Sequence, residues 1–182
     1  MEHTIIGAWV NGRIRIVVPD ITTLNVDVIV NAANAALCGD GGVDGAIHRA
    51  AGPELLEECR TLGSARPGEV EVTQAYRLPS KLVAHAVGPV WDGGSKGEPA
   101  LLEACYRRSP EITEERGLRT GAFPAISTGA YRYPLRDATH IAQRTVRNHL
   151  MSNQLPRQVT FCCHSTRDAR VYEQVANDIL DR

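Results

Sequence analysis

Short aliphatic runs alternate along this chain with longer amphipathic segments. The short runs, rich in Val, Ile and Ala, predict strands over residues 4–10, 13–18, 26–30, 69–74, 82–87, 122–126 and 158–163. Segments whose apolar positions recur every three or four residues predict helices over residues 43–51, 53–62, 99–116, 135–152 and 168–180. Strands that alternate with helices predict an α/β fold, in which helices cover both faces of a largely parallel sheet.

The first three predicted strands indicate an N-terminal hairpin and a candidate ligand-binding site at the carboxyl end of the third strand. Asn11-Gly12 separates the first two strands, and both residues tolerate positive φ angles, so the pair predicts a two-residue hairpin turn. The strand over 26–30 is almost entirely aliphatic and is followed by the polar segment NAAN, which ends at Asn34. This pattern predicts a strand buried on both faces whose carboxyl end carries polar side chains, where α/β folds bind ligands.

The composition narrows the class of protein. The 182 residues are 43% hydrophobic and 23% charged, which fits one globular domain over residues 1–182. The 20 Lys and Arg balance 21 Asp and Glu, so nucleic acid and anionic membranes are disfavoured as partners, and an anionic ligand must be held locally. The five cysteines show no paired spacing, and no apolar run approaches the ~20 residues of a membrane helix. We therefore expect a soluble cytoplasmic protein.

A glycine-rich loop precedes the helix predicted over 43–51. Gly39, Gly41 and Gly42 leave the backbone free to approach a ligand, and the N–H groups at the start of the helix attract anionic oxygens. The same glycines also suit an ordinary turn, with Asp44 as an acid in the first turn of the helix. The segment alone leaves both interpretations open.

A second glycine-bearing turn, Ser127-Thr128-Gly129-Ala130-Tyr131, follows the strand predicted over 122–126. Its hydroxyl and backbone N–H groups can form an anion-binding concavity at the same edge of the sheet. Two such sites at neighbouring strand ends would suit a diphosphate. An ordinary strand-to-helix connection capped by Ser or Thr is the simpler interpretation of this turn when it is taken by itself.

Asp20-Ile21-Thr22 follows the strand predicted over 13–18. A carboxylate at position 20 can accept a hydrogen bond from an exocyclic amine such as that of adenine. An N-cap or an Asx turn is the simpler interpretation of the same residues.

Taken in order, these motifs resemble one family. The segments DIT, VDVIVNAAN, GGVDGAIHRAAGPEL, AHAVGPVW and FPAISTGAYRYP are similar to those of MacroD-type macrodomains, which include bacterial O-acetyl-ADP-ribose deacetylases. The similarity runs from about Arg13 to the C-terminal helix. It implies a three-layer α/β/α sandwich with a mixed, largely parallel six-stranded sheet, to which the hairpin adds an extra N-terminal strand. It also implies an ADP-ribose cleft at the strand ends.

The resemblance assigns roles to the matching positions. Asp20 would bind the adenine amine, Ile21 would line the adenine pocket, and His164 would stack on the base. Asn34 would hold the distal ribose and Asp44 would act beside the scissile bond, as the catalytic pair. The other substrate-binding positions would wrap the ligand in two loops: Gly41, Gly42 and Val43, then Ser127, Thr128, Gly129, Ala130 and Tyr131. We expect no cofactor, and the chemistry needs no metal if water is held between Asp44 and the ligand.

The implied function is hydrolysis of an ester on the distal ribose of ADP-ribose. Water held between Asp44 and the ligand would attack the acetyl carbonyl of O-acetyl-ADP-ribose, or the anomeric carbon of a ribose esterified to Asp or Glu of a mono-ADP-ribosylated protein. The alternatives are an ADP-ribose reader without catalysis and a regulatory interaction protein such as a ribonuclease modulator. The balanced charge makes direct binding of nucleic acid the least favoured.

Two positions depart from the family. Asp40 replaces a usual glycine, and its carboxylate is expected to weaken diphosphate binding unless it points to solvent. Pro19 also replaces a usual glycine, which removes a backbone donor and fixes φ before the DIT motif.

Four other residues are weaker candidates for a role in the site. His48 lies one helical turn after Asp44 and is a candidate to orient it, whereas His85 fits a satisfied core histidine. Asn31 is expected to satisfy loop backbone rather than to touch ligand, and Cys38 to be small and structural.

Overall fold

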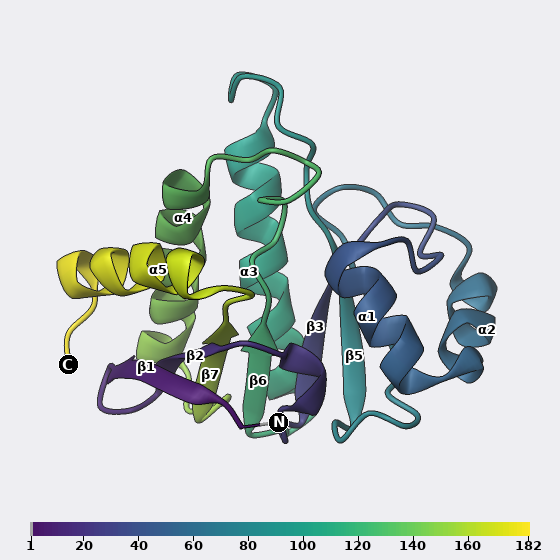
Figure 1. Cartoon of the computed structure of the whole chain (residues 1–182), viewed down its shortest axis with the longest axis horizontal. Helices are drawn as coiled ribbons and strands as arrows, with labels where there is room; N and C mark the ends of the chain where they lie inside the picture. Colours follow the sequence, from purple (N-terminus) through teal and green to yellow (C-terminus); the bar gives the residue numbers. More distant parts are fainter. Residues whose placement is uncertain (1) are drawn as a thin grey trace.

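A mixed seven-stranded sheet forms the centre of the molecule in the computed structural model, which describes residues 2–182 (Figure 1). The strands follow the chain as β1 (Thr4–Trp9), β2 (Ile14–Val18), β3 (Val28–Ala33), β4 (Val70–Gln74), β5 (Leu82–Val87), β6 (Thr120–Phe123) and β7 (Gln158–Cys162). Their order across the sheet is β1-β2-β7-β6-β3-β5-β4. The central neighbours from β2 to β5 are parallel, and β1 and β4 pair antiparallel at the two edges. This confirms the predicted largely parallel sheet with an additional N-terminal strand.

Helices cover both faces of the sheet, as the sequence pattern predicted. They are the 3-10 helix η1 (Ile21–Thr23) and the α-helices α1 (Gly42–Ala51), α2 (Pro53–Leu62), α3 (Glu98–Glu115), α4 (Leu135–Ser152) and α5 (Thr166–Ile179). One apolar core joins the sheet to η1, α1 and α2, and a second joins its opposite face to α3, α4 and α5. Figure 1 shows α1 and α2 together at one end, away from α4 and α5. The result is a three-layer α/β/α sandwich.

The N-terminal hairpin turns differently from the two-residue turn expected at Asn11-Gly12. Trp9 pairs with Ile14, so the connection also includes Val10, and φ is positive at Val10, Asn11 and Gly12. The physical reason lies outside the hairpin: the N–H groups of Val10 and Asn11 donate to carbonyl oxygens of the last two residues of the chain, at 2.6 and 2.8 Å. The C-terminus thereby holds the wider turn.

Two central strands have different ends from those expected. Strand β6 ends at Phe123 because Pro124 has no N–H to continue the ladder. Strand β3 continues to Ala33, since residues 31–33 pair with residues 85–87 of β5. The first part of the NAAN segment is therefore strand rather than loop.

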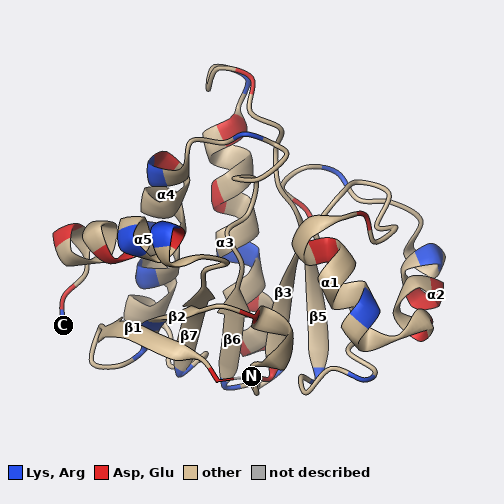
Figure 2. Cartoon of the chain, in the orientation of Figure 1, with Lys and Arg blue, Asp and Glu red and all other residues tan. Residues whose placement is uncertain are grey.

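Residues of both charge signs are distributed over the helices, as Figure 2 shows. Within residues 2–182, none of the helices combines the length and the apolar character that crossing a bilayer requires.

Candidate functional site

A cavity of about 480 Å³ opens where the central parallel strands end. It is bordered by the segment between β3 and α1, by the residue after β5 and by the loop after β6. The residues that line it are Ala32, Ala33, Asn34, Asp40, Gly41, Gly42, Val43, Asp44, Gly88, Ala125, Ile126, Ser127, Gly129, Ala130 and Tyr131. The structure thus brings together both glycine-bearing segments singled out in the sequence.

The first wall of the cavity is the start of α1. Its N-cap is Gly41, which supplies no capping side chain, so the first N–H groups of the helix are left for an anionic partner. Gly42 has a φ of +67°, a conformation that a side chain at this position would strain. A Cβ at Gly41 or Gly42 would meet no atom within 4 Å, which agrees with an open space beside the helix start.

The second wall is the loop after β6. Ser127 has a φ of +67° and is 7% exposed, and its Oγ has no hydrogen-bond partner within the described part of the chain. The loop is braced at both sides: Tyr133 N donates to Ser127 O, and Trp91 N donates to Tyr131 O, each at 2.9 Å. The Ser127 hydroxyl oxygen is itself buried, so an anion at this braced loop would be held by its backbone N–H groups.

Asn34 and Asp40 contact each other at the solvent-exposed rim of the cavity. Asn34 Nδ2 donates to Asp40 Oδ2 at 2.6 Å, and the two residues are separated by only six positions of loop. The Asp40 carboxylate therefore contacts the Asn34 amide and does not simply point into solvent. Cys38 N also donates to Asn34 Oδ1, at 3.4 Å, which ties the same amide to the loop.

Asp44 lies beneath the glycine loop and is 5% exposed. Its Oδ1 accepts from Asn31 Nδ2 at 2.8 Å, and its Oδ2 accepts from Asp40 N at 3.1 Å. Burial raises the pKa of this carboxyl, and the hydrogen bond from Asn31 and the neighbouring His48 oppose the increase. His48 Nε2 lies 3.5 Å from Asp44 Oδ1, as expected for a residue one turn further along the helix. A fixed carboxylate of increased basicity therefore borders the cavity.

Asn31 corrects one expectation from the sequence. Instead of satisfying loop backbone, its fully buried side chain donates to Asp44 and contacts His85 Nδ1 at 3.1 Å. The reason is that Asn31 lies within β3, opposite His85 of β5, and not in the loop beyond the strand. His85 is the satisfied core histidine that was expected, because Thr73 Oγ1 contacts its other ring nitrogen at 2.9 Å.

His48, Cys59 and His85 also approach one another, with possible ligand atoms within 4.8 Å. Both nitrogens of His85 are already engaged in hydrogen bonds. Burial and nearby carboxylates raise the pKa of the Cys59 thiol to about 11, so it keeps its proton. These hydrogen bonds account for His85, whereas His48 Nε2 has no hydrogen-bond partner within the described residues.

The residues expected near adenine lie at the same sheet edge but do not line the cavity. Asp20 follows β2 and His164 follows β7, and these are neighbouring parallel strands. Asp20 Oδ1 accepts from Thr22 N at 2.9 Å and caps η1, and Ile21 is buried. His164 is exposed. Thr128 likewise lies outside the cavity lining, between lining residues.

Sequence reasoning missed several residues of the cavity wall that carry no polar side chain. They are Ala32, Ala33, Gly88, Ala125 and Ile126. Gly88 could have been identified, since a glycine directly after a buried strand often marks a site where another segment approaches the backbone closely. A Cβ at this position would lie 2.1 Å from Ser127 Oγ. The alanines gave no such signal, because they are equally common in cores.

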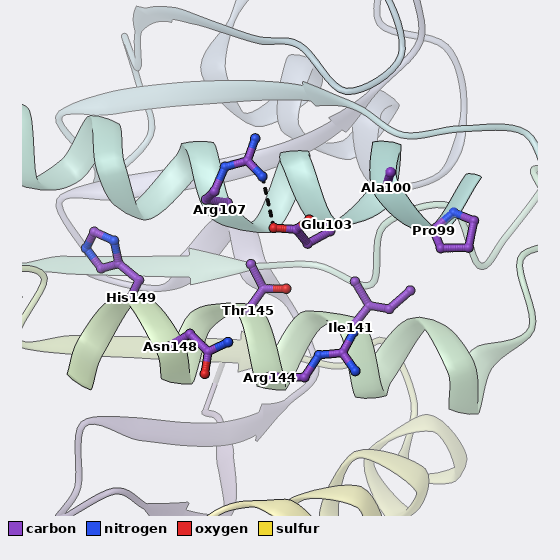
Figure 3. Close-up of a pocket in the computed structure, with 9 residues that line it drawn as sticks. All are labelled: Pro99, Ala100, Glu103, Arg107, Ile141, Arg144, Thr145, Asn148 and His149. Carbon is purple, nitrogen blue, oxygen red and sulfur yellow. Dashed lines mark hydrogen bonds and ion pairs between the residues drawn. The ribbon is translucent and has the colours of Figure 1, made fainter. Parts of the chain in front are cut away.

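A separate groove of about 530 Å³ lies between α3 and α4 (Figure 3). Arg107 and Glu103 form an ion pair at 2.9 Å on one side of it, and Arg144 and Asn148 lie on the other. None of the candidate site residues lines this groove.

The chain is similar to known proteins over most of its length. Residues 30–142 match the family model described as the Macro domain. A macro domain-containing protein of Chlorobaculum tepidum is 54% identical over 164 residues, which are 90% of this chain and 95% of that protein. An O-acetyl-ADP-ribose deacetylase of Citrobacter koseri is 52% identical over 167 residues, 90% of this chain and 94% of that protein.

Solved structures agree with these sequence similarities. The Oceanobacillus iheyensis macrodomain with ADP has a TM-score of 0.93 and 38% identity over 98% of both chains. The Trypanosoma brucei macrodomain in complex with ADP-ribose has a TM-score of 0.85 and 40% identity, over 90% of this chain and 68% of that one. The Macro domain match over residues 30–142 includes both loops that border the cavity, the one before α1 and the one after β6.

Proposed function

This chain belongs to the macro domain family, and from that premise we propose that it is a single macrodomain that binds ADP-ribose and hydrolyses esters carried on the distal ribose. The observation that carries the proposal is the cavity at the strand ends, where a helix start without a capping side chain faces a braced serine loop, with buried Asp44 beside them. Relatives about half identical to this chain are named for deacetylation of O-acetyl-ADP-ribose.

In this proposal the diphosphate lies between the two loops. The N–H groups at the start of α1 and those of the loop from Ser127 to Ala130 hold its oxygens, as helix starts and backbone concavities do for anions in general. The adenine extends toward Asp20, Ile21 and His164, beyond the cavity. Related macrodomains have been solved with ADP and with ADP-ribose, which supports this class of ligand.

The distal ribose then lies beside Asn34, Asp44 and Tyr131. Asn34 holds the ribose, and Asp44 orients or deprotonates the attacking water. The raised pKa of Asp44 favours the second role, because a carboxylate of increased basicity accepts a proton more readily. Backbone N–H groups near Gly41 stabilise the negative charge that develops when water attacks an acetyl carbonyl. No metal takes part in these steps.

The same arrangement serves two kinds of ester. O-acetyl-ADP-ribose presents an acetyl carbonyl, and a protein mono-ADP-ribosylated on Asp or Glu presents the anomeric carbon of the ribose. We propose both as substrates, with the first favoured by the names of the relatives. A reader without catalysis is the alternative, and the buried Asp44, held at both oxygens, argues against it.

We further propose that the protein acts in the cytoplasm and does not bind nucleic acid. The five cysteines are all free thiols, which fits a reducing compartment. The formal net charge of −1 gives no general attraction for phosphate backbones.

The test is incubation of the purified protein with O-acetyl-ADP-ribose and, separately, with a peptide mono-ADP-ribosylated on Glu, followed by chromatography of the products. The proposal expects ADP-ribose together with acetate or the free peptide. Calorimetry with ADP-ribose runs in parallel and is expected to give micromolar binding. Binding of ADP-ribose without turnover of either ester would identify the protein as a non-catalytic ADP-ribose reader. The absence of binding would refute the assignment of the cavity as an ADP-ribose site.

A further inference from the structure

A line of buried hydrogen bonds runs through the sheet and ends at Asp44. Thr73 Oγ1 lies 2.9 Å from His85 Nε2, and Asn31 Nδ2 lies 3.1 Å from His85 Nδ1 and 2.8 Å from Asp44 Oδ1. Thr73 is 2% exposed, and His85 and Asn31 are fully buried. The four residues come from β4, β5, β3 and α1, so the line crosses three neighbouring strands before it reaches the helix.

The alternation of side chains along each strand explains why these polar groups meet. Asn31 lies two residues after Ile29, and His85 two residues after Val83, and both aliphatic residues belong to the core beneath α1 and α2. Asn31 and His85 are register partners in the parallel pair of β3 and β5. The polar side chains therefore occupy the face on which α1 places Asp44.

The chemistry of each partner fixes which group donates in each of these bonds. Asp44 is an acceptor only, so Asn31 must present its amide N–H₂ to it. The other hydrogen of that amide is donated to His85 Nδ1, which leaves the ring proton on Nε2 for donation to Thr73 Oγ1. Thr73 in turn donates its hydroxyl hydrogen to Gln74 O at 3.0 Å. The alternative tautomer of His85 would set two donors against each other at Asn31.

We propose that Thr73 and His85 are positioning residues for the hydrolysis: together they fix the side-chain amide of Asn31, which holds the Asp44 carboxylate in place at the cavity. The role rests on the proposed function, because it requires Asp44 to act on the ribose ester. Neither Thr73 nor His85 touches the ligand in this role. Each acts through the amide of Asn31.

The groups around Asp44 determine how its pKa changes if the hydrogen bond from Asn31 is lost. His48 faces it from its own helix, Asp40 from the glycine loop and Cys59 from α2. Burial, with His48 as a second cause, lowers the pKa of His85 to about 3, so its ring stays neutral near neutral pH. The Asn31 hydrogen bond is foremost among the groups that oppose the raised pKa of Asp44. Loss of that bond must therefore raise the pKa further.

The decisive variant is Thr73→Val, which keeps the side-chain shape and removes the hydroxyl. His85 Nε2 then keeps only its longer contact with Cys59 Sγ at 3.8 Å. The ring can therefore take its other tautomer and turn Asn31 away from Asp44. We expect kcat near neutral pH to fall about tenfold or more, since a small misplacement of a reacting group has effects of this size. The acidic limb of the kcat profile is expected to move to higher pH, while calorimetric affinity for ADP stays within about twofold of wild type.

Three comparisons keep this test specific. Thr73→Ser retains the hydroxyl and is expected to restore wild-type kcat and pH profile. Thr113→Val removes another buried hydroxyl, bonded to Ser109 O in α3 at 3.0 Å, and is expected to leave both unchanged. Thr73→Ala removes the same hydroxyl with less bulk, and it replaces the valine variant if that variant does not fold.

A spectroscopic measurement tests the line without turnover. The ¹⁵N shifts of the His85 ring are expected to show a protonated Nε2 and a bare Nδ1 in the wild type, and a mixture of tautomers in Thr73→Val. A wild-type ring protonated on Nδ1, or a Thr73→Val protein with unchanged kcat and pH profile, would overturn this role while the proposed function stands. A wild type that hydrolyses neither ester would overturn both together.

Discussion

The side-chain amide of Asn34 donates to the carboxylate of Asp40, with 2.6 Å between Nδ2 and Oδ2. Both residues line the cavity, and in the proposed complex the same amide holds the distal ribose. The carboxylate of Asp40 therefore competes with the ribose for Asn34. The competition differs from the repulsion of the diphosphate that the sequence suggested, because it acts only on ligands that carry the distal ribose.

Replacing Asp40 by glycine is thus expected to tighten binding of ADP-ribose by about 0.5–1 kcal/mol, the usual net value of one hydrogen bond. Affinity for ADP, which lacks the distal ribose, is expected to change less. Calorimetry at low and high salt measures both, and the gain is expected to be larger at low salt. Asp40→Asn keeps an acceptor and removes the charge, so it separates the two effects. Weaker binding of ADP-ribose by Asp40→Gly would mean that Asp40 supports the loop or contacts the ligand.

Gly88 packs against the serine loop, and its replacement tests whether that loop holds the diphosphate. A Cβ at this position would lie 2.1 Å from Ser127 Oγ and 2.6 Å from Ile126 Cγ2. Gly88→Ala is expected to cost about 1–3 kcal/mol of unfolding free energy through overpacking and to weaken binding of ADP. Gly121→Ala is the matched control, because its nearest contact would be an ordinary 3.6 Å. Denaturant titration measures the unfolding free energy, and calorimetry measures the affinity for ADP. An unchanged ADP affinity in a folded Gly88→Ala protein would show that the serine loop, residues 127–131, does not hold the diphosphate.

Asp20 is expected to bind the adenine amine in addition to capping η1. Asp20→Ala would then weaken ADP and ADP-ribose equally, by about 1–3 kcal/mol, because both ligands contain adenine. This pattern differs from that of Asp40, whose effect depends on the distal ribose. Since Asp20 Oδ1 already accepts from Thr22 N and Thr22 Oγ1, melting temperatures must accompany the titrations. A lower melting temperature with unchanged affinity for both ligands would leave Asp20 as a cap alone.

How well the sequence predicted the fold depended on where the signals lay. Helix α2 begins and ends as predicted, because Pro53 suits its first turn and Gly63, with a φ of +81°, ends it. Both signals are local and can be recognised in a single segment. The hairpin turn could not be predicted in the same way, because its conformation depends on hydrogen bonds from Val10 and Asn11 to the far end of the chain.

The same distinction applies to the site. The glycine loop and the serine loop could be identified because each is a local motif at the end of a strand, and the structure brings them to one cavity. The role of Asn31 could not be identified, since it depends on the pairing of β3 with β5 and on the position of α1 above them. A polar residue within an aliphatic strand was the available signal. The same signal was present in His85.

Glu98 supports the site from a distance and gives a prediction on pH. Its buried carboxylate accepts from the N–H groups of Asp92, Gly94 and Lys96, and so fixes the loop that carries Trp91, which in turn braces Tyr131. Burial alone would raise the pKa of Glu98, but these backbone donors outweigh it and lower the pKa to about 2 from an ordinary value of 4.5.

A lowered pKa means that the stabilisation by Glu98 is complete above about pH 4.5 and is lost as the pH falls toward 2. Glu98→Gln is expected to be less stable than wild type at pH 7, and the difference is expected to shrink over this acidic range. Urea denaturation at a series of pH values measures it. A constant difference from pH 7 to pH 2.5 would show that the charge on Glu98 does not stabilise the loop.

The central claim is that Asp44 acts in hydrolysis, and the most direct test is the turnover of O-acetyl-ADP-ribose by Asp44→Ala at saturating substrate. Circular dichroism and denaturant titration serve as the controls for folding, because Asp44→Ala leaves the Asn31 amide and the Asp40 N–H without their acceptor, at about 1–3 kcal/mol for a buried donor. We expect a folded protein that still binds ADP-ribose and whose kcat falls at least about 100-fold. A folded Asp44→Ala protein with wild-type kcat would contradict the account.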